Sequence, residues 1–290
     1  MKRITGMLLG FLAVGSFGMA AAQAQSSPPP KVLTVFREFV KPGKGGAMHD
    51  KTESAFVEAS MRAKWPTRYL GMNSLSGKPR ALFFTAYDSF DAWEKDTQAT
   101  AKNTAFSAAL DRASVADGDL LDSTDAGVWA YREDYSLRPN SDMAHMRYFD
   151  IAVFHVKQGH HKDWDDAVKM VLAGYQKSVP DTHWACYEGV YGVPEGTYAF
   201  ITARKSASEI DQGFAQDKDF MAAMGEDGMK KLDELSAVAI DSSESNLFMF
   251  NPKMSYVSDE WVKADPDFWK PKPAAAPAPK KKAEKAAAAQ

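Results

Sequence analysis

The sequence predicts an α+β fold in which two ferredoxin-like βαββαβ units pack sheet against sheet. Three repeated phrases lead to this prediction. "FVKPGKGGAMHD" from Phe39 returns as "HVKQGHHKDWDD" from His155, "AFSAAL" from Ala105 as "DFMAAM" from Asp219, and "STDAGVWAY" from Ser123 as "SSESNLFMF" from Ser242. Matches in one order, at offsets of 116, 114 and 119 residues, indicate an internal duplication. A period this long predicts two domains rather than a solenoid.

The first strand of each unit is the stretch "VLTVFREFV" (32–40) or "YFDIAVFHV" (148–156). Both are rich in β-branched and aromatic residues, and both end at a turn, Pro42-Gly43 or Gln158-Gly159. A helix follows each strand. In the second unit its apolar residues fall on one helical face, and the first unit repeats this pattern more weakly. The two sets are Trp164, Val168, Val171, Leu172 and Tyr175, and Met48, Ala55, Phe56, Ala59 and Ala63.

The remaining elements also occur in pairs. Pro66 and Pro180 mark the exits from the helices, and strand-like stretches resume at 68–75 and 183–191. Turns rich in Pro and Gly then lead to "ALFFTAY" and "TYAFITAR", which predicts a hairpin in each unit. A second helical region and a last strand, 128–135 or 247–250, complete the order βαββαβ.

The units span residues 32–138 and 144–257. Residues 1–24 are predicted to be a signal peptide, because Lys2 and Arg3 precede an apolar run that ends at Ala22-Gln23-Ala24. The alternative is a membrane anchor, but the apolar run is shorter than the roughly 20 residues of a span. We therefore expect a periplasmic or secreted protein that begins at Gln25, with a linker at 25–31. Residues 258–290 are expected to form an extended, largely disordered tail rich in Pro, Ala and Lys.

Composition narrows the classes of function. The formal net charge of -3 is too small to indicate a nucleic-acid partner. Cys186 is the single cysteine, so no intramolecular disulfide can form, and its neighbours favour a buried apolar thiol over a nucleophile. We also expect no membrane span and a monomer built as an internal pseudo-dimer.

In the order of its elements and in the Val-Lys-Pro-Gly motif at Val40–Gly43, the chain resembles the dimeric α/β-barrel superfamily. That group includes antibiotic-biosynthesis monooxygenases, stress-responsive A/B-barrel proteins, NIPSNAP-like proteins and the haem-containing chlorite dismutases. The resemblance implies that two sheets enclose a barrel-like cavity, here within one chain as a pseudo-dimeric α/β barrel. It would imply haem for the last branch, but no histidine can be matched to an axial ligand.

The repeat also suggests which residues line such a cavity. Arg37 and His155 share strand faces with apolar residues, and the resemblance implies that these faces point inward. An apolar wall with a few polar groups is typical of a small-molecule site. The predicted ligand-binding residues are Arg37, His155, Tyr69, His183 and Trp129. The alternative interpretation is structural: a histidine at a strand end, an arginine paired with Glu38 or Glu133, and core aromatic residues.

No metal or other cofactor is predicted. Potential metal ligands follow one another closely at His160, His161, Asp163, Asp165 and Asp166. The side chains of neighbouring residues at a helix start point in different directions, however, and Asp163 stands where a helix N-cap is expected. No Gly-rich phosphate loop, nucleophile elbow or Cys-x-x-Cys pair occurs in the sequence.

Two hypotheses for function remain. The favoured one is a non-catalytic exported protein that binds a small apolar or aromatic ligand, or a partner, in the barrel cavity. The alternative is a cofactor-independent monooxygenase or isomerase in which cavity groups such as His155 polarise or deprotonate the substrate. Convergent ionisable groups beside a cavity would favour the enzyme.

Overall fold

The computed structural model describes residues 26–270. The predicted signal peptide and the chain beyond Lys270 lie outside the described residues. Within the described part, no helix combines the length and the apolar character that a membrane crossing requires.

Eight antiparallel strands close into a barrel, which confirms the mixed α+β class. In chain order they are β1 (Val32–Val40), β2 (Tyr69–Ser74), β3 (Arg80–Tyr87), β4 (Leu121–Leu137), β5 (Tyr148–Val156), β6 (Trp184–Tyr191), β7 (Thr197–Arg204) and β8 (Ile240–Phe250). Around the barrel their order is β1-β3-β2-β8-β5-β7-β6-β4. The strands of residues 32–137 are thus adjacent, those of residues 148–250 are adjacent, and the pairs β2–β8 and β4–β6 join the two sets.

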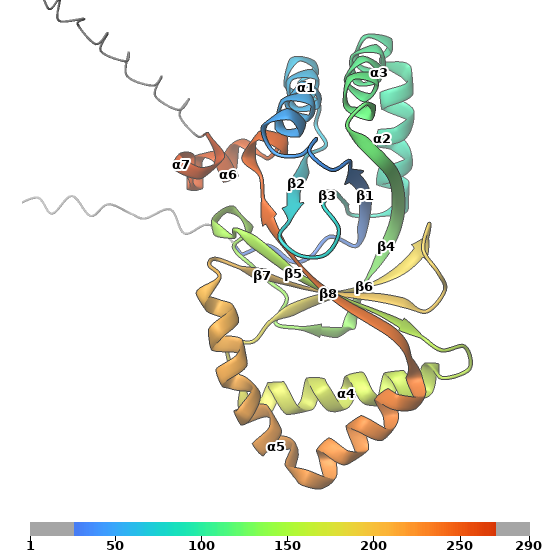
Figure 1. The fold of residues 1–290 in the computed structure, drawn as a ribbon, viewed down its shortest axis with the longest axis vertical. Helices are drawn as coiled ribbons and strands as arrows, with labels where there is room; N and C mark the ends of the chain where they lie inside the picture. Colours follow the sequence, from blue (N-terminus) through green and yellow to red (C-terminus); the bar gives the residue numbers. More distant parts are fainter. Residues whose placement is uncertain (1–25, 271–290) are drawn as a thin grey trace, which may run out of the picture.

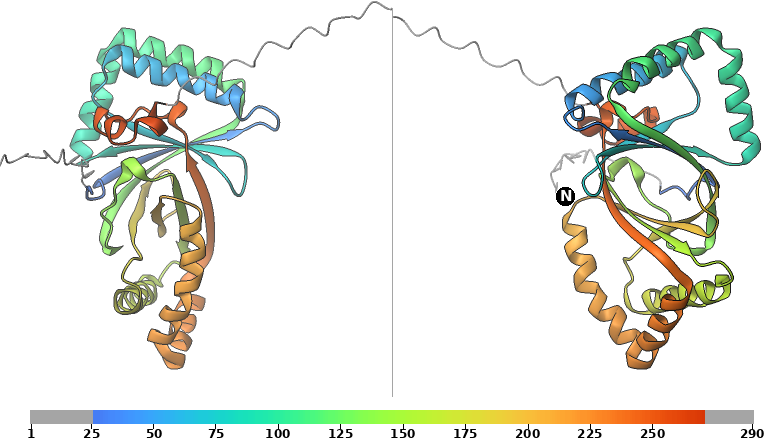
Figure 2. Two further views of the ribbon diagram at one scale, coloured as in Figure 1. Left: turned by 90° about the vertical axis from the view of Figure 1, so that its left-hand side faces the viewer. Right: turned by 45° about the vertical axis from the view of Figure 1, so that its right-hand side comes forward.

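Helices cover the barrel on two opposite sides (Figure 1). On one side lie α1 (Ala47–Ala63), α2 (Phe90–Lys102) and α3 (Thr104–Gly118). On the other lie α4 (His161–Ser178) and α5 (Ser208–Ala239), which is kinked at Gly225. Figure 2 shows the same two helical layers, with the barrel between them, from two further directions.

The last strand of each half is longer than the sequence predicts. β4 begins at Leu121 and β8 at Ile240, about seven residues before the predicted 128–135 and 247–250. The added residues are mostly polar and exposed, so they carry no apolar alternation. Their backbones nevertheless pair with the neighbouring first strands, for example Asp125 with Arg37 and Glu244 with Val153.

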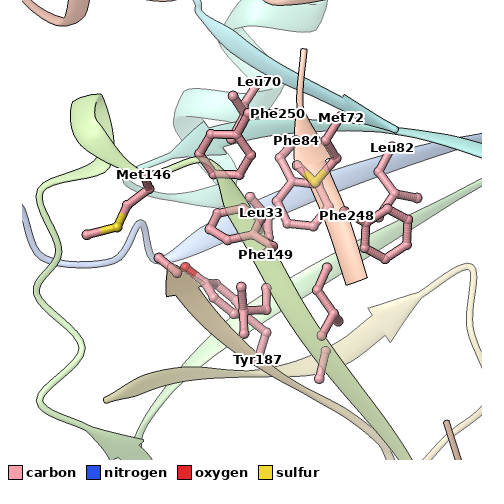
Figure 3. Packing of buried hydrophobic residues seen from close by; sticks show 14 of the residues in the cluster. Leu33, Leu70, Met72, Leu82, Phe84, Met146, Phe149, Tyr187, Phe248 and Phe250 are labelled. Atoms are coloured by element: carbon pink, nitrogen blue, oxygen red, sulfur yellow. The ribbon is translucent and has the colours of Figure 1, made fainter. Parts of the chain in front are cut away.

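The interior of the barrel is a packed apolar core. It receives buried side chains from every strand, because alternate residues of a strand point to the same side. Its buried members are Leu33, Leu70, Met72, Leu82, Phe84, Trp129, Met146, Phe149, Ile151, Tyr187, Ala199, Ile201, Ala203, Phe248, Phe250 and Trp269. Figure 3 shows how the labelled side chains from opposite strands meet. Each large side chain so buried contributes about 1.5–3 kcal/mol to folding.

A second apolar cluster lies under α4 and α5. Trp164 stacks on Tyr198 with ring centroids 5.3 Å apart, and Phe154 packs against both Trp164 and Phe200. Cys186 is fully buried in this layer, and burial raises the pKa of its thiol well above the ordinary value. The expected inert, buried cysteine agrees with this position.

The stretch 259–269, which the sequence assigns to an extended tail, contains two short helices, α6 (Asp259–Ala264) and α7 (Pro266–Trp269). Trp269 is 6% exposed, and its indole Nε1 donates to the Ala144 carbonyl at 2.8 Å. Arg147 pairs with Asp265 and lies over the Phe268 ring. The aromatic residues of this segment therefore belong to the barrel core. The sequence prediction missed this because it was based on the Pro-, Ala- and Lys-rich composition of the residues that follow.

Candidate functional site

A buried group of four ionisable side chains lies between the outer face of the sheet and helices α1 and α3. We call it the acid–histidine cluster: Glu38, His49, Glu53 and Asp117. Glu38 points from β1 toward the helices, His49 and Glu53 lie one turn apart on α1, and Asp117 lies near the end of α3. Between 1% and 4% of each residue is exposed.

The ligand atoms of the four side chains all lie within 4.8 Å of one another. The His49 Nε2 atom is 3.0 Å from Glu38 Oε2, 3.5 Å from Asp117 Oδ1 and 3.9 Å from Glu53 Oε1. The Thr52 hydroxyl donates to Asp117 Oδ1 at 2.5 Å, which fixes the orientation of that carboxylate. The imidazole thus stands at the centre of three carboxyl groups.

Several polar atoms in this cluster have no hydrogen-bond partner. They are Glu53 Oε1, Asp117 Oδ2 and the hydroxyl of the neighbouring Tyr69, each with almost no exposed surface. Leaving a buried polar group unpaired costs about 1–3 kcal/mol, and more for a charged one. Burial, together with the charges of Glu38 and Asp117, raises the pKa of Glu53 to about 10. Burial likewise raises the pKa of Glu38.

The fold itself does not require these polar groups. Glu38 is the third residue from the end of β1, and Phe154 occupies the same position in β5. Phe154 packs with Trp164 and Phe200, so an aromatic cluster fills that layer of the barrel. Because an apolar residue is suitable at this position of the fold, the buried carboxyl of Glu38 indicates a function rather than a folding requirement.

A cavity of about 480 Å³ lies beside the cluster, enclosed by the sheet and helices α1, α2 and α3. We call it the aromatic cavity. Seven rings contribute to its walls, and exposed residues such as Ser114 line its outer end, so it reaches solvent. The seven are Phe36, Phe56, Trp65, Tyr69, Phe83, Tyr87 and Phe106. Its volume lies within the range of about 300–1,000 Å³ that is typical of small-molecule sites.

The charges around the aromatic cavity are all of one sign. Glu38, Glu53, Asp117 and Asp96 line it, and none of its described lining residues is Lys or Arg. Asp96 accepts hydrogen bonds from Trp65 Nε1 at 3.0 Å and from the Tyr87 hydroxyl at 3.0 Å. Such walls favour neutral or cationic molecules over anions.

The predicted ligand-binding residues do not converge on one cavity. Arg37 and Trp129 line a void of about 60 Å³ inside the barrel. Arg37 also forms a two-pronged ion pair with Asp125, in which the Nη2–Oδ2 distance is 2.8 Å. The charge of Arg37 is therefore balanced by Asp125, and not by Glu38 or Glu133.

Of the other three predicted residues, His155 lies apart, whereas His183 and Tyr69 both line one cavity at an end of the barrel. His155 contacts the Thr197 hydroxyl at 2.9 Å near the end of β5. His183 lines an apolar cavity of about 320 Å³ at one end of the barrel, and its Nε2 lies 2.9 Å from the Ala203 carbonyl. Tyr69 packs with Phe83 on the helix side of the sheet, beside the acid–histidine cluster. The ligand-binding role of these residues remains a prediction.

The histidines and aspartates at the start of α4 do not converge into a metal site. The helix begins at His161 with His160 as its N-cap, so Asp163 lies in the first turn and not at the cap as predicted. Asp165 and Asp166 pair with Lys169 and Lys162 on the helix surface. Among residues 26–270, only the acid–histidine cluster brings three or more potential ligand side chains together.

Sequence reasoning missed this cluster because its members are distant in the chain. Asp117 lies 65 residues beyond Thr52, to which it hydrogen-bonds. One local signal was present: His49 and Glu53 have the i, i+4 spacing that places both on one face of a helix. Glu38 was interpreted as a surface acid, although its position on β1 is that of a helix-facing residue.

The donor set does not fit haem. His49 is the one buried histidine among the described residues, and three carboxyl groups surround its Nε2. An axial imidazole needs an open face toward the porphyrin ring, which the carboxyl groups around His49 Nε2 do not leave.

No protein-family model matches the sequence, and no curated protein matches it either. Several solved structures have a similar fold. A candidate monooxygenase from Fusobacterium nucleatum has a TM-score of 0.49 and 11% identity, over 77% of this chain and 93% of that one. An anthrone oxidase-like protein has a TM-score of 0.45 and 14% identity, over 76% and 92%. A variant of chlorite dismutase from Candidatus Nitrospira defluvii has 0.45 and 10%, over 81% and 96%.

The prediction of a non-catalytic binding protein is contradicted. The similar structures carry the names of oxygenases, an oxidase-like protein and chlorite dismutases. At 8–14% identity, these names are said of those proteins alone and assign no particular reaction to this chain. In this chain, ionisable groups converge beside the aromatic cavity, which is the arrangement expected for the enzymatic alternative.

Proposed function

We propose that the protein is an enzyme whose reaction centre is the acid–histidine cluster, and that it acts on a small aromatic or apolar molecule held in the aromatic cavity. One observation carries this proposal: four buried ionisable side chains and an unpartnered phenol meet at the inner end of a cavity with aromatic walls. Such convergence distinguishes a reaction site from a filled core.

The reaction class is polarisation and deprotonation of the bound molecule. A carbonyl oxygen of the substrate accepts a hydrogen bond from the Tyr69 hydroxyl, which like other phenols is protonated at neutral pH. A carboxylate or imidazole atom of the cluster acts as the general base and takes a proton from the carbon next to the carbonyl group. The electron pair of that C–H bond moves toward the carbonyl oxygen. The proton is then returned to another carbon of the same molecule. This completes an isomerisation, which requires no oxidant or reductant.

The aromatic walls support the choice of substrate. Rings on both the sheet and the helices offer faces and edges to an aromatic molecule, and pairs of this kind add about 0.5–1.5 kcal/mol beyond area burial. The absence of Lys and Arg from the described lining disfavours carboxylates and phosphates.

The internal duplication and the exported location belong to the same proposal. The order of elements in residues 32–137 matches that in residues 148–250, which supports two ferredoxin-like units whose sheets form one pseudo-dimeric barrel. In this arrangement the unit of residues 32–138 carries the reaction centre, and the unit of residues 144–257 completes the barrel. The predicted signal peptide supports an enzyme that is exported to the periplasm or secreted.

Deuterium exchange tests the proposed chemistry without knowledge of the natural substrate. We expect the purified protein to accelerate exchange at the acidic C–H of small aromatic ketones in D2O, measured by NMR. Glu53→Gln keeps the side-chain shape and should lower this rate by about 100-fold or more, the range for loss of an acid–base group. Glu58→Gln, an exposed change on the same helix, is the matched control. Equal rates in Glu53→Gln and wild type, or no acceleration with uncharged aromatic ketones, would contradict the proposal.

A further inference from the structure

We infer that the acid–histidine cluster is a binding site for one divalent first-row metal ion, with Mn²⁺ and Fe²⁺ as the best matches. This inference extends the proposed function by naming a cofactor for the same site. It departs from the expectation of no metal, and it stands on the geometry of the four side chains, whatever reaction takes place there.

The distances between the ligand atoms fit a metal ion. Bonds of about 2.0–2.2 Å from one ion place neighbouring ligand atoms about 3.0–3.5 Å apart. The His49 Nε2 atom lies 3.0 Å from Glu38 Oε2 and 3.5 Å from Asp117 Oδ1. The Glu53 Oε1 atom lies farther away, at 3.9 Å, and would move closer on metal binding. Each of the four residues has a ligand atom within 4.8 Å of the others.

Two carboxylate oxygens point to a missing partner. Glu53 Oε1 and Asp117 Oδ2 accept no hydrogen bond, although 3% of Glu53 and 1% of Asp117 is exposed. The three carboxyl groups surround one imidazole, and no Lys or Arg is among the described residues that line the adjoining cavity. A divalent ion would give the two free oxygens a partner and would supply a positive charge beside them.

The types of ligand select the kind of ion. Oxygen ligands suit Mg²⁺, Ca²⁺ and Mn²⁺, whereas an imidazole suits Zn²⁺, Fe²⁺, Cu²⁺ and Ni²⁺. Three carboxyl groups and one imidazole therefore match ions between the two sets, of which Mn²⁺ and Fe²⁺ are the common examples. No thiol is present to favour softer ions, because Cys186 lies in the other helical layer.

Two further features support a site built to hold an ion. The Thr52 hydroxyl donates to Asp117 Oδ1, which orients this carboxylate as outer hydrogen bonds commonly do around metals. Glu38, Glu53 and Asp117 also line the aromatic cavity, so a bound ion would keep a position open toward a substrate. There the ion would act as a Lewis acid on an oxygen of the bound molecule.

The test is titration of chelator-treated protein with Mn²⁺, followed by calorimetry and by electron paramagnetic resonance of the bound ion. We expect one ion per chain, a rise in the melting temperature of the wild type, and at least a 100-fold loss of affinity in Glu53→Gln and in Asp117→Asn. Both variants keep side-chain size, and circular dichroism checks that each is folded. Glu58→Gln should bind as the wild type does.

Unchanged Mn²⁺ binding in both cluster variants would assign the ion to surface acids and overturn the inference. No binding by folded wild-type protein would mean a metal-free, hydrogen-bonded cluster, and would overturn it as well. The deuterium-exchange assay separates this failure from failure of the proposed function. Exchange without metal binding would support the proposed reaction and rule out the metal site. Metal binding without exchange would support the metal site and rule out the proposed reaction.

Discussion

Replacing Phe248 by alanine should lower the free energy of unfolding by about 3–5 kcal/mol, the cost typical of emptying a Phe-sized space in a core. Phe248 is 2% exposed and lies in the barrel interior on β8, opposite Phe149 of β5 and Ser74 of β2. These neighbours come from both halves of the chain, so the cavity would weaken the junction that closes the barrel. Urea unfolding followed by tryptophan fluorescence measures the change.

The next residue provides the control for this experiment. Met249 is 40% exposed because alternate residues of β8 point away from the interior. Met249→Ala should therefore change the free energy of unfolding by no more than about 0.5 kcal/mol. Similar costs for the two variants would show that the barrel interior is not packed as described.

Residues 26–138 expressed alone should dimerise or aggregate instead of remaining monomeric. Without the second half, β2 and β4 lose their partners β8 and β6, and the inner face of the sheet meets water. Unpaired strand edges promote association. Each large apolar side chain left exposed, such as Leu33, Phe84 or Trp129, costs about 1.5–3 kcal/mol. Sedimentation velocity measures the outcome.

Co-expression with residues 139–270 is the control, because this second piece retains β5 to β8 and the core residue Trp269. The two pieces should form a soluble one-to-one complex. A stable monomer of the first piece at micromolar concentration would contradict the inference that each half needs the other to cover its inner sheet face and strand edges.

Much of the barrel could be predicted because its signals are local. Alternation along 32–40 and 148–156 placed Leu33, Val35, Phe149 and Ile151 on one face, and that face lines the core. The polar starts of β4 and β8 could not be predicted, because backbone pairing alone makes them strands. The same limit applies to residues 259–269, where the contacts of Trp269 decide the outcome.

The candidate site was less accessible to sequence reasoning. Glu38 follows Arg37 in an alternating strand, so the inward face implied for Arg37 leaves Glu38 facing the helices, but nothing in the sequence shows which side chains meet it there. Asp117 joins the cluster only because α3 packs beside α1. Arg37 was predicted to bind a ligand, but an arginine in a barrel can be paired with the residue opposite it in register, here Asp125.

Anomalous X-ray diffraction from crystals grown with Mn²⁺ shows whether the acid–histidine cluster holds a metal ion. We expect one strong anomalous peak between α1, α3 and β1, about 2.0–2.3 Å from His49 Nε2 and from an oxygen of Glu38, Glu53 and Asp117. Crystals in which Mn²⁺ scatters only from surface carboxylates, while these four side chains remain hydrogen-bonded to one another, would contradict it.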